Sequence, residues 1–227
     1  MQNILAQGFY TIKEAASLIA LDVIGVTHSS LRRAFSETKR YEAAVESTRA
    51  YDGKVTDISF NDLLELRFIA YFKNKGVTSQ AIRKAAETAR QEFGPHPFAR
   101  RDVVFKQEGR KIFSEAAEET GDKRFLDLIQ KQYAFELVQD FFDQGVEWSA
   151  SQYAEYWQPK KTAFPSIVID PRVSFGRPSI INRGLAVDTV FDALEAEDGD
   201  YDAVANWFEI DPQLVREAVQ FRDELPV

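Results

Sequence analysis

The sequence has no cysteine and only two histidines, His28 and His96, which lie far apart along the chain. Without cysteine the chain cannot carry a disulfide framework, a catalytic thiolate or a cysteine-ligated zinc site. Two distant histidines argue against a catalytic or metal-bound histidine pair, whereas a metal site made of carboxylates stays open. We therefore expect no cofactor, and the sequence alone assigns no metal ligands.

Long apolar runs are also missing. A helix that spans a bilayer needs about 20 apolar residues in succession, and no such run occurs. Residues 1–6 lack the basic segment and the long apolar core of a secretion signal, so we expect a cytoplasmic protein with no membrane partner. The length of 227 residues, 44% hydrophobic and 28% charged, suits one large folded domain or two small ones.

Positive charge is in the minority, with a net charge of −8, and it is unevenly distributed. Residues 1–100 hold 14 of the 28 lysines and arginines and 11 of the 36 acids, a balance of +3, whereas residues 101–227 hold 14 and 25, a balance of −11. Affinity for nucleic acid comes largely from cations that neutralise phosphates. The asymmetry therefore indicates different partners for the two parts of the chain.

Residues 9–35 have the pattern of a helix-turn-helix. Thr11 and Glu14 have the spacing of a capping box, which satisfies free backbone N–H groups at a helix start. One apolar stripe then recurs at helical spacing through Ile12, Ala15, Ala16 and Ile19. After a break in the pattern, Ser29 or Ser30 can cap a second helix.

The second predicted helix has a basic outer face. Leu31 and Phe35 are four residues apart and are expected to face inward, which leaves Arg32 and Arg33 outward. A guanidinium is planar, always charged and suited to bidentate pairing with phosphates or guanine edges. The alternative is that these are two short amphipathic helices that only pack against the rest of the protein.

Residues 51–56 contain an Asp-Gly turn signal between short β-prone pieces and predict a small wing. Ser59, Asn61 or Asp62 can cap a deeply packed helix that runs to residue 72, and Gly76 ends it. Thr78 then caps a helix over residues 79–93.

This order of elements resembles the MerR-type winged helix-turn-helix domains over about residues 9–93. Their pattern runs Tyr-Thr, an apolar helix, a turn and a helix with Leu-Arg-Arg, as in residues 10–33, and residues 62–69, 75–78 and 82 are similar to their helix pair after the wing. The turn here is longer, and the usual basic Arg-Tyr signature of the wing is missing. For operator DNA we predict contacts from Thr11, Lys13, Ser29, Ser30, Arg32 and Arg33, with Lys39, Arg40 and Lys54 as backbone anchors.

The middle of the chain is expected to hold a β-hairpin and a long helix. Residues 102–105 and 111–113 flank a possible turn at Gly109. Residues 125–142 read as one helix whose inner face is Phe125, Leu128, Ile129, Tyr133, Leu137 and Phe141. This face is either core or the seam of a homodimer, because helix-turn-helix proteins usually read two half-sites. Residues 147–164 lack periodicity and are expected to be an aromatic-rich linker that packs against another part of the protein.

The C-terminal part is predicted to contain a sharp corner at residues 176–178 and then three helices. The inward residues of these helices are expected to be Val187, Val190, Phe191 and Leu194, then Val204, Trp207 and Phe208, then Leu214, Val215, Ala218 and Phe221. Asp211 and Pro212 fit the start of the third helix. Residues 187–227 hold 12 acids against two arginines, so we expect a protein partner here rather than DNA.

Residues 169–178 and 183–187 resemble a small domain of unknown function that occurs alone or at the C-terminus of VapB-type bacterial antitoxins. The whole layout is similar to the VapB45-like antitoxins. The resemblance implies a mainly α protein that neutralises a PIN-like ribonuclease toxin and represses its own operon. It divides the chain into a DNA-binding domain (1–94), a hairpin and long helix for packing or dimerisation (95–146), a linker (147–164) and a three-helix toxin-binding domain (165–227).

Arg172, Arg177 and Arg183 are the candidates for toxin contact, because a PIN-like site clusters carboxylates around a metal and an arginine fork pairs well with carboxylates. The alternative is that Arg172 and Arg177 brace the corner by hydrogen-bonding to backbone carbonyls.

An enzymatic function is not expected, since no histidine lies near the hydroxyls and carboxylates of residues 170–188, and the Gly-Arg-Pro corner is not a phosphate-cradling loop. Two other functions stay open. One is a MerR-like regulator without a toxin, whose C-terminal domain serves dimerisation or ligand binding, and the other is a pure interaction scaffold.

Overall fold

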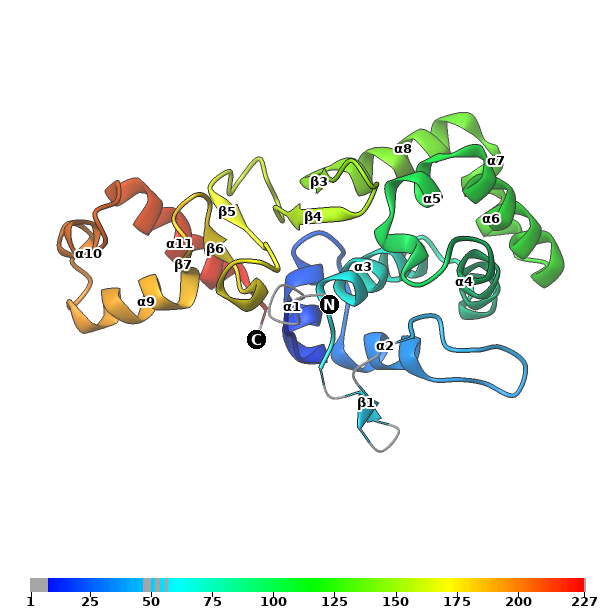
Figure 1. Ribbon diagram of the computed structural model, residues 1–227, viewed down its shortest axis with the longest axis horizontal. Coiled ribbons are helices and arrows are strands. Elements are labelled where there is room, and N and C mark those ends of the chain that lie inside the picture. Colours follow the sequence, from blue (N-terminus) through cyan, green and yellow to red (C-terminus); the bar gives the residue numbers. More distant parts are fainter. Residues whose placement is uncertain (1–7, 47–49, 52–53, 56, 227) are drawn as a thin grey trace.

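The computed structural model describes residues 8–46, 50–51, 54–55 and 57–226, and it is mainly helical, as the sequence predicts. Small antiparallel sheets join the helices. Figure 1 shows a larger lobe built from the helices of the first two thirds of the chain and a smaller C-terminal lobe beside it. Among the described residues, no helix has the length and apolarity needed to cross a membrane.

The first of the two N-terminal helices begins as expected, and the second differs in its cap. Helix α1 (Ile12–Ala20) starts with the predicted capping box of Thr11 and Glu14. Helix α2 (His28–Arg32), which runs into the short 3-10 turn η2 (Arg33–Phe35), is capped by Thr27 and not by Ser29 or Ser30. Thr27 has extended backbone angles and forms a reciprocal box with Ser30, so the cap lies two or three residues earlier than predicted.

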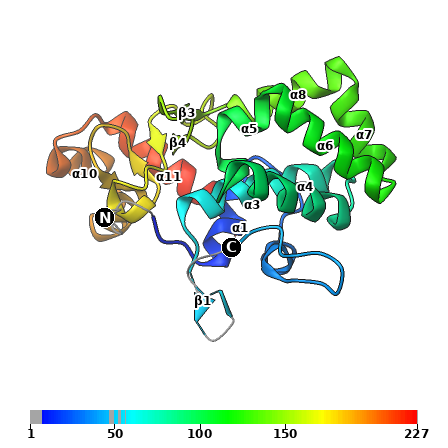
Figure 2. The same ribbon diagram turned by 45° about the vertical axis from the view of Figure 1, so that its right-hand side comes forward.

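A short antiparallel strand pair follows, β1 (Ala50–Tyr51) with β2 (Lys54–Val55), where the wing is predicted; the turn residues Asp52 and Gly53 lie outside the described residues. Figure 2 shows that it projects from the same side of the molecule as α2. Helices α3 (Phe60–Asn74) and α4 (Ser79–Phe93) then start at the predicted caps Ser59 and Thr78.

The predicted β-hairpin over residues 102–113 is wrong. After the turn η3 (Pro97–Ala99), the chain forms helices α5 (Arg101–Phe105) and α6 (Gln107–Thr120). Gly109 lies inside α6, and a Cβ atom there would lie 1.6 Å from the carbonyl oxygen of Val103. This glycine therefore permits close packing of two helices and does not form a turn.

The predicted long helix is divided at Lys131, whose backbone is extended, into α7 (Lys123–Gln130) and α8 (Gln132–Asp143). Phe125, Leu128 and Ile129 on α7 are buried as expected. The change of direction gives α8 a different inner face, so Tyr133 and Leu137 are 74% and 47% exposed. The residues that α8 buries instead are Phe135, Val138 and Phe142.

Residues 147–164, which were predicted to be a linker, contain regular β-structure. Strands β3 (Val146–Trp148) and β4 (Ala154–Trp157) form an antiparallel pair. Trp157 is fully buried, and its backbone pairs with Ile169 of the C-terminal lobe. The expectation that the aromatic residues of this stretch pack is therefore met by Trp157.

The C-terminal lobe combines the three predicted helices with a small sheet of order β5-β6-β7. The strands are β5 (Ile167–Val168), β6 (Ser179–Ile180) and β7 (Leu185–Ala186), and the helices are α9 (Val187–Ala196), α10 (Tyr201–Phe208) and α11 (Pro212–Glu224). The corner is a 3-10 turn, η4 (Ser174–Gly176). The inward position predicted for Trp207 is wrong, because α10 buries Val204 and Ala205 and leaves Trp207 67% exposed.

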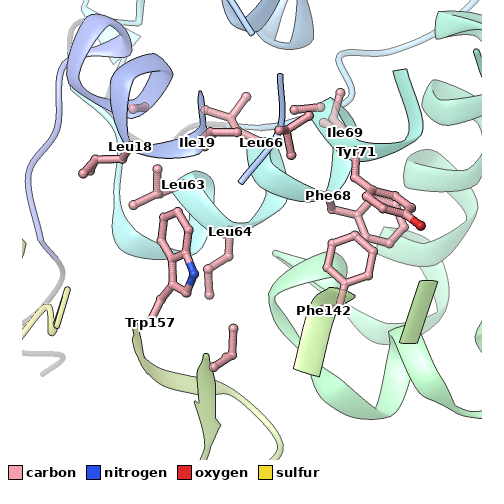
Figure 3. Close-up of a cluster of buried hydrophobic side chains, with 14 of the residues drawn as sticks. Leu18, Ile19, Leu63, Leu64, Leu66, Phe68, Ile69, Tyr71, Phe142 and Trp157 are labelled. Carbon is pink, nitrogen blue, oxygen red and sulfur yellow. The ribbon is translucent and has the colours of Figure 1, made fainter. Parts of the chain in front are cut away.

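Helix α3 is the centre of the core. It is buried around most of its circumference, and it packs between α1, the aromatic residues of α8 and the indole of β4. Figure 3 shows Leu63 beside Leu18 of α1, Phe68 and Tyr71 near Phe142, and Trp157 reaching in from the hairpin. The position of the helix-turn-helix relative to the other helices is thus set by α3.

Candidate nucleic-acid interface

Helix α2 presents its two arginines to solvent. Leu31 is 2% exposed and packs inward, while Arg32 and Arg33 are exposed. Arg33 donates through Nε to the carbonyl oxygen of Ser29 at 3.2 Å. In the part of the chain that the structure describes, neither guanidinium is paired with a carboxylate. Their charge is therefore available to a ligand at the end of α2.

Two of the three hydroxyls predicted to contact DNA, those of Thr11 and Ser30, have structural partners. Thr11 Oγ1 accepts from the backbone N–H of Glu14 at 3.2 Å. Ser30 Oγ donates to the carbonyl of Thr27 at 2.7 Å and accepts from the Thr27 N–H at 3.0 Å. Both side chains remain exposed, so Thr11 caps α1 and Ser30 completes the capping box of α2 at the surface of the candidate interface.

Lys13 lies on the side of α1 that faces the end of the chain. It borders a cavity of about 450 Å³ that is shared with Thr27 and His28 at the start of α2 and with Pro226. It also borders a second cavity of about 440 Å³ that contains Arg177. The structure therefore places Lys13 close to the beginning of α2 and, at the same time, at the junction with the C-terminal lobe.

Lys39 and Arg40 are exposed in the loop after α2, which two arginines of α4 hold in place. Arg83 donates to the carbonyls of residues 33 and 36 at 2.9 and 3.0 Å. Arg90 donates to the carbonyls of residues 43 and 44 at 2.7 and 3.0 Å. The backbone of Lys54 lies in β2, but its side chain is outside the described residues. Arg32, Arg33, Lys39 and Arg40 are thus surface cations of one region.

A buried ion pair connects the turn of the helix-turn-helix with α3. Arg67 of α3 is 2% exposed, and its Nε lies 3.0 Å from Oδ2 of Asp22, which follows α1. Its Nη2 donates to the carbonyl of Phe141 at 2.9 Å, and its guanidinium lies 5.1 Å from the ring of Trp157. Burial lowers the pKa of Arg67, and Asp22 opposes that shift.

Sequence reasoning did not identify the structural roles of Arg67, Arg83 and Arg90. For Arg67 there was a signal, because a charged residue stands in an otherwise apolar helix and must find a partner when it is buried. For Arg83 and Arg90 there was none, since basic residues on an amphipathic helix are ordinarily solvated. Their acceptors are carbonyls of a distant loop.

The two lobes meet at the predicted corner. Tyr10 is buried, and its hydroxyl donates to the carbonyl of Gly176 at 2.8 Å. The N–H of Phe9 donates to the carbonyl of Phe175 at 3.0 Å. Gly176 has φ +84°, and a Cβ atom there would lie 2.3 Å from the Tyr10 oxygen. Burial raises the pKa of Tyr10 well above its ordinary value, so the phenol stays protonated and donates this bond.

The three arginines predicted to contact a toxin have different surroundings. Arg172 forms a fork with Asp170 at 2.9 and 2.8 Å and lies 3.7 Å from Glu155. The hydrogen bond to Asp170 raises the pKa of Arg172. Arg172 thus pairs with carboxylates and not with the backbone carbonyls of the corner. Arg177 and Arg183 are exposed, and among the described residues no ion pair involves either.

Comparisons with known proteins identify relatives of this chain. Residues 167–221 match the model of a family described as a protein of unknown function, DUF433. A curated protein named "Putative antitoxin VapB45", from Mycobacterium tuberculosis (strain ATCC 25618 / H37Rv), is 24% identical over 175 residues, which cover 74% of this chain and 72% of the relative. The expected similarity to VapB45-like antitoxins is therefore confirmed.

A solved structure shares the fold. The crystal structure titled as that of Rv2018 from Mycobacterium tuberculosis aligns with a TM-score of 0.69 at 22% identity. The alignment covers 92% of this chain and 96% of the solved chain. The arrangement of the larger and the smaller lobe therefore recurs in a protein of similar length.

Proposed function

We propose that this chain is the antitoxin of a toxin–antitoxin system. Its N-terminal part is a MerR-like winged helix-turn-helix that binds the operator of its own operon as a repressor. Its C-terminal lobe binds and neutralises a PIN-like ribonuclease toxin. The observation that carries the DNA-binding half is the exposure of Arg32 and Arg33 on α2, whose opposite side is anchored by Leu31. The strand pair β1–β2, on the same side of the molecule, supports it (Figure 2).

Fluorescence anisotropy with the DNA upstream of the gene tests this half of the proposal. Replacing Arg32 or Arg33 by Ala is expected to weaken binding by about 5- to 150-fold and to relax specificity, since one bidentate base contact is worth about 1–3 kcal/mol. Lys39→Ala is expected to weaken binding to all DNA sequences alike and to reduce the slope of log affinity against log salt concentration by about one. Lys111→Ala removes an exposed cation of α6 that lies outside the candidate interface, and it is the matched control. Equal effects of Arg32→Ala and Lys111→Ala would contradict the proposal.

A homodimer is part of the proposal, because helix-turn-helix proteins commonly read two half-sites. Tyr133 and Leu137 of α8 are large apolar side chains that this chain leaves exposed. Light scattering is expected to give twice the chain mass for the wild type and the chain mass for the Tyr133→Glu/Leu137→Glu variant. A monomeric wild type at micromolar concentration would contradict this part.

The toxin-binding half is supported by the similarity of the chain to the curated protein named "Putative antitoxin VapB45" and by the surface of the C-terminal lobe. Arg177 and Arg183 extend from the β-sheet side of an otherwise acidic lobe. Co-expression with the product of the neighbouring gene, followed by affinity capture and a ribonuclease assay, tests for a complex. The Arg177→Glu/Arg183→Glu variant is expected to lose inhibition, and it leaves the Arg172–Asp170 pair intact. Full inhibition by this variant would eliminate the idea that these arginines block the toxin.

A second candidate function is a DNA-binding regulator that responds to a small ligand and has no toxin. It is favoured by one observation, a cavity of about 330 Å³ between α2 and helices α3 and α4. The cavity is bordered by Arg33, Ile69, Ile82 and Arg83. The neighbouring reading frame distinguishes the two functions, because only the antitoxin requires an adjacent ribonuclease.

A further inference from the structure

Three titratable side chains meet in the interior at the start of α3, away from the candidate interface. Asp62 and Glu65 are three residues apart and therefore lie on one face of α3. They are 1% and 2% exposed. His96, from the segment between α4 and η3, reaches the same place, with a side chain 16% exposed. Nothing in the proposed function uses this cluster.

Each carboxylate has one oxygen occupied by the fold and one directed at the imidazole. Oδ2 of Asp62 accepts from the N–H and the hydroxyl of Ser59 at 2.7 and 2.8 Å. Oε1 of Glu65 accepts from the N–H of Phe98 at 3.3 Å. The remaining oxygens, Oε2 of Glu65 and Oδ1 of Asp62, lie 3.3 and 3.5 Å from His96 Nδ1.

Oδ1 of Asp62 is the informative atom. It is buried and has no hydrogen-bond partner, and its ionic contact with His96 Nδ1 is 3.5 Å long. Leaving a buried carboxylate oxygen without a partner is costly, and such atoms in native structures require an explanation. A ligand that binds between Oδ1 of Asp62, Oε2 of Glu65 and Nδ1 of His96 would satisfy this oxygen.

We propose that Asp62, Glu65 and His96 bind a divalent transition-metal ion, with Zn²⁺ as the best fit. Zinc bonds to nitrogen and oxygen are about 2.0–2.2 Å long, so the ligand atoms of a tetrahedral site lie about 3.3–3.6 Å apart. The two measured distances from His96 Nδ1 are 3.3 and 3.5 Å, and all three donor atoms lie within 4.8 Å of one another. Solvent supplies the fourth ligand, and the partly exposed imidazole marks the side of entry.

The donor set selects the class of ion. An imidazole nitrogen favours Zn²⁺ and similar transition metals over Mg²⁺ and Ca²⁺, which prefer oxygen-only sites. Two carboxylates balance the charge of a divalent ion in the interior. The exposed Glu46 also acts on His96, and its charge is offset by Arg90, which lies 3.2 Å from it. The bound ion would tie α3 to the segment that follows α4.

Titration calorimetry of the chelator-stripped full chain with ZnCl₂ tests the proposal. The wild type is expected to bind about one ion per chain and to gain thermal stability from it. His96→Gln is expected to weaken binding by at least tenfold and to abolish the stabilisation. The matched control is His28→Gln, because His28 is the other histidine of the chain and is exposed on α2; it should bind like the wild type.

Two further measurements, on Glu65→Gln and on the unmodified chain, test the proposal if His96→Gln does not fold. Glu65→Gln retains hydrogen-bonding capacity and is expected to weaken binding without loss of helical circular dichroism. In the unmodified chain, the ¹⁵N resonance of His96 Nδ1 is expected to shift on addition of Zn²⁺, while that of His28 stays in place. Absence of stoichiometric binding by the wild type, or equal loss in the two histidine variants, would overturn the proposal.

Discussion

Removal of the buried charge of Arg67 is the sharpest test of how the helix-turn-helix is attached. In Arg67→Met the apolar volume is largely retained, so the change removes the charge and its bonds without opening a large cavity. Two hydrogen bonds are lost, to Asp22 at 3.0 Å and to the carbonyl of Phe141 at 2.9 Å. Both are charge-assisted and lie in the interior, where one such bond is worth about 1.5–3 kcal/mol.

The expected loss is about 3 kcal/mol, which is the lower end of the range for breaking a buried ion pair. The upper end is not reached because the side chain of Asp22 is 13% exposed and keeps some contact with water. For a chain of this size, about 3 kcal/mol corresponds to a melting temperature lower by about 6–12 °C. Urea unfolding followed by circular dichroism and tryptophan fluorescence measures the free energy directly.

A double-mutant cycle separates the ion pair from the other contacts of Arg67. Asp22→Asn in the wild type leaves a buried guanidinium without its counter-charge, whereas in Arg67→Met it removes a carboxylate that has already lost its partner. The expected coupling energy is about 2 kcal/mol. Lys111→Met, in a pair that is 74% and 56% exposed, is the control and should change stability by less than about 0.5 kcal/mol. A loss below about 1 kcal/mol for Arg67→Met, or additive single effects, would refute the reasoning.

Three further changes test other contacts by unfolding measurements. Gly176→Ala brings a Cβ to 2.3 Å from the hydroxyl of Tyr10, whereas Gly184→Ala, with φ +65° and its nearest atom at 3.8 Å, meets only backbone strain of about 1–2 kcal/mol. Gly176→Ala should therefore lower the free energy of unfolding by clearly more than Gly184→Ala. Equal losses would contradict the contact between the lobes. Although burial opposes it, hydrogen bonds from backbone N–H groups at the starts of α7 and α4 lower the pKa of Asp122. The stability that Asp122 contributes is therefore present above its unfolded pKa of about 4 and is lost as the pH falls through the lower folded value. Asp122→Asn should cost about 1 kcal/mol at pH 7 and should make the free energy of unfolding less dependent on pH below about 4. An unchanged pH dependence in that range would speak against this role. Gly109→Ala places a methyl group 1.6 Å from a carbonyl oxygen of α5. It should lower the free energy of unfolding by more than about 3 kcal/mol, although alanine is the better helix former. A neutral effect would show that α5 and α6 can separate freely.

Several helix starts were determined by the sequence itself. Thr11 with Glu14, Ser59 at the start of α3, and Asp211 with Pro212 at the start of α11 all lie at the predicted positions. Each cap is a hydrogen bond between residues two or three positions apart, so its energy depends on the local sequence alone. The similarity of the chain to VapB45-like antitoxins was likewise readable from local motifs.

Tertiary packing decided where local signals were ambiguous. Gly109 reads equally well as a turn or as a contact between helices, and only the proximity of Val103 distinguishes the two. The break at Lys131 has no glycine or proline to announce it, and it moved Tyr133 and Leu137 from the predicted inner face to the surface. Hydrophobic periodicity continues through such a break, because it records spacing and not direction.

The junctions and the candidate metal site exist only in three dimensions. Arg67 meets Asp22 across 45 positions, and Tyr10 meets Gly176 across 166. His96 joins Asp62 and Glu65 from the far end of α4, which is why two distant histidines did not predict a site that needs only one. Local residue spacing carries no information about such partners, since their approach depends on how the helices between them pack.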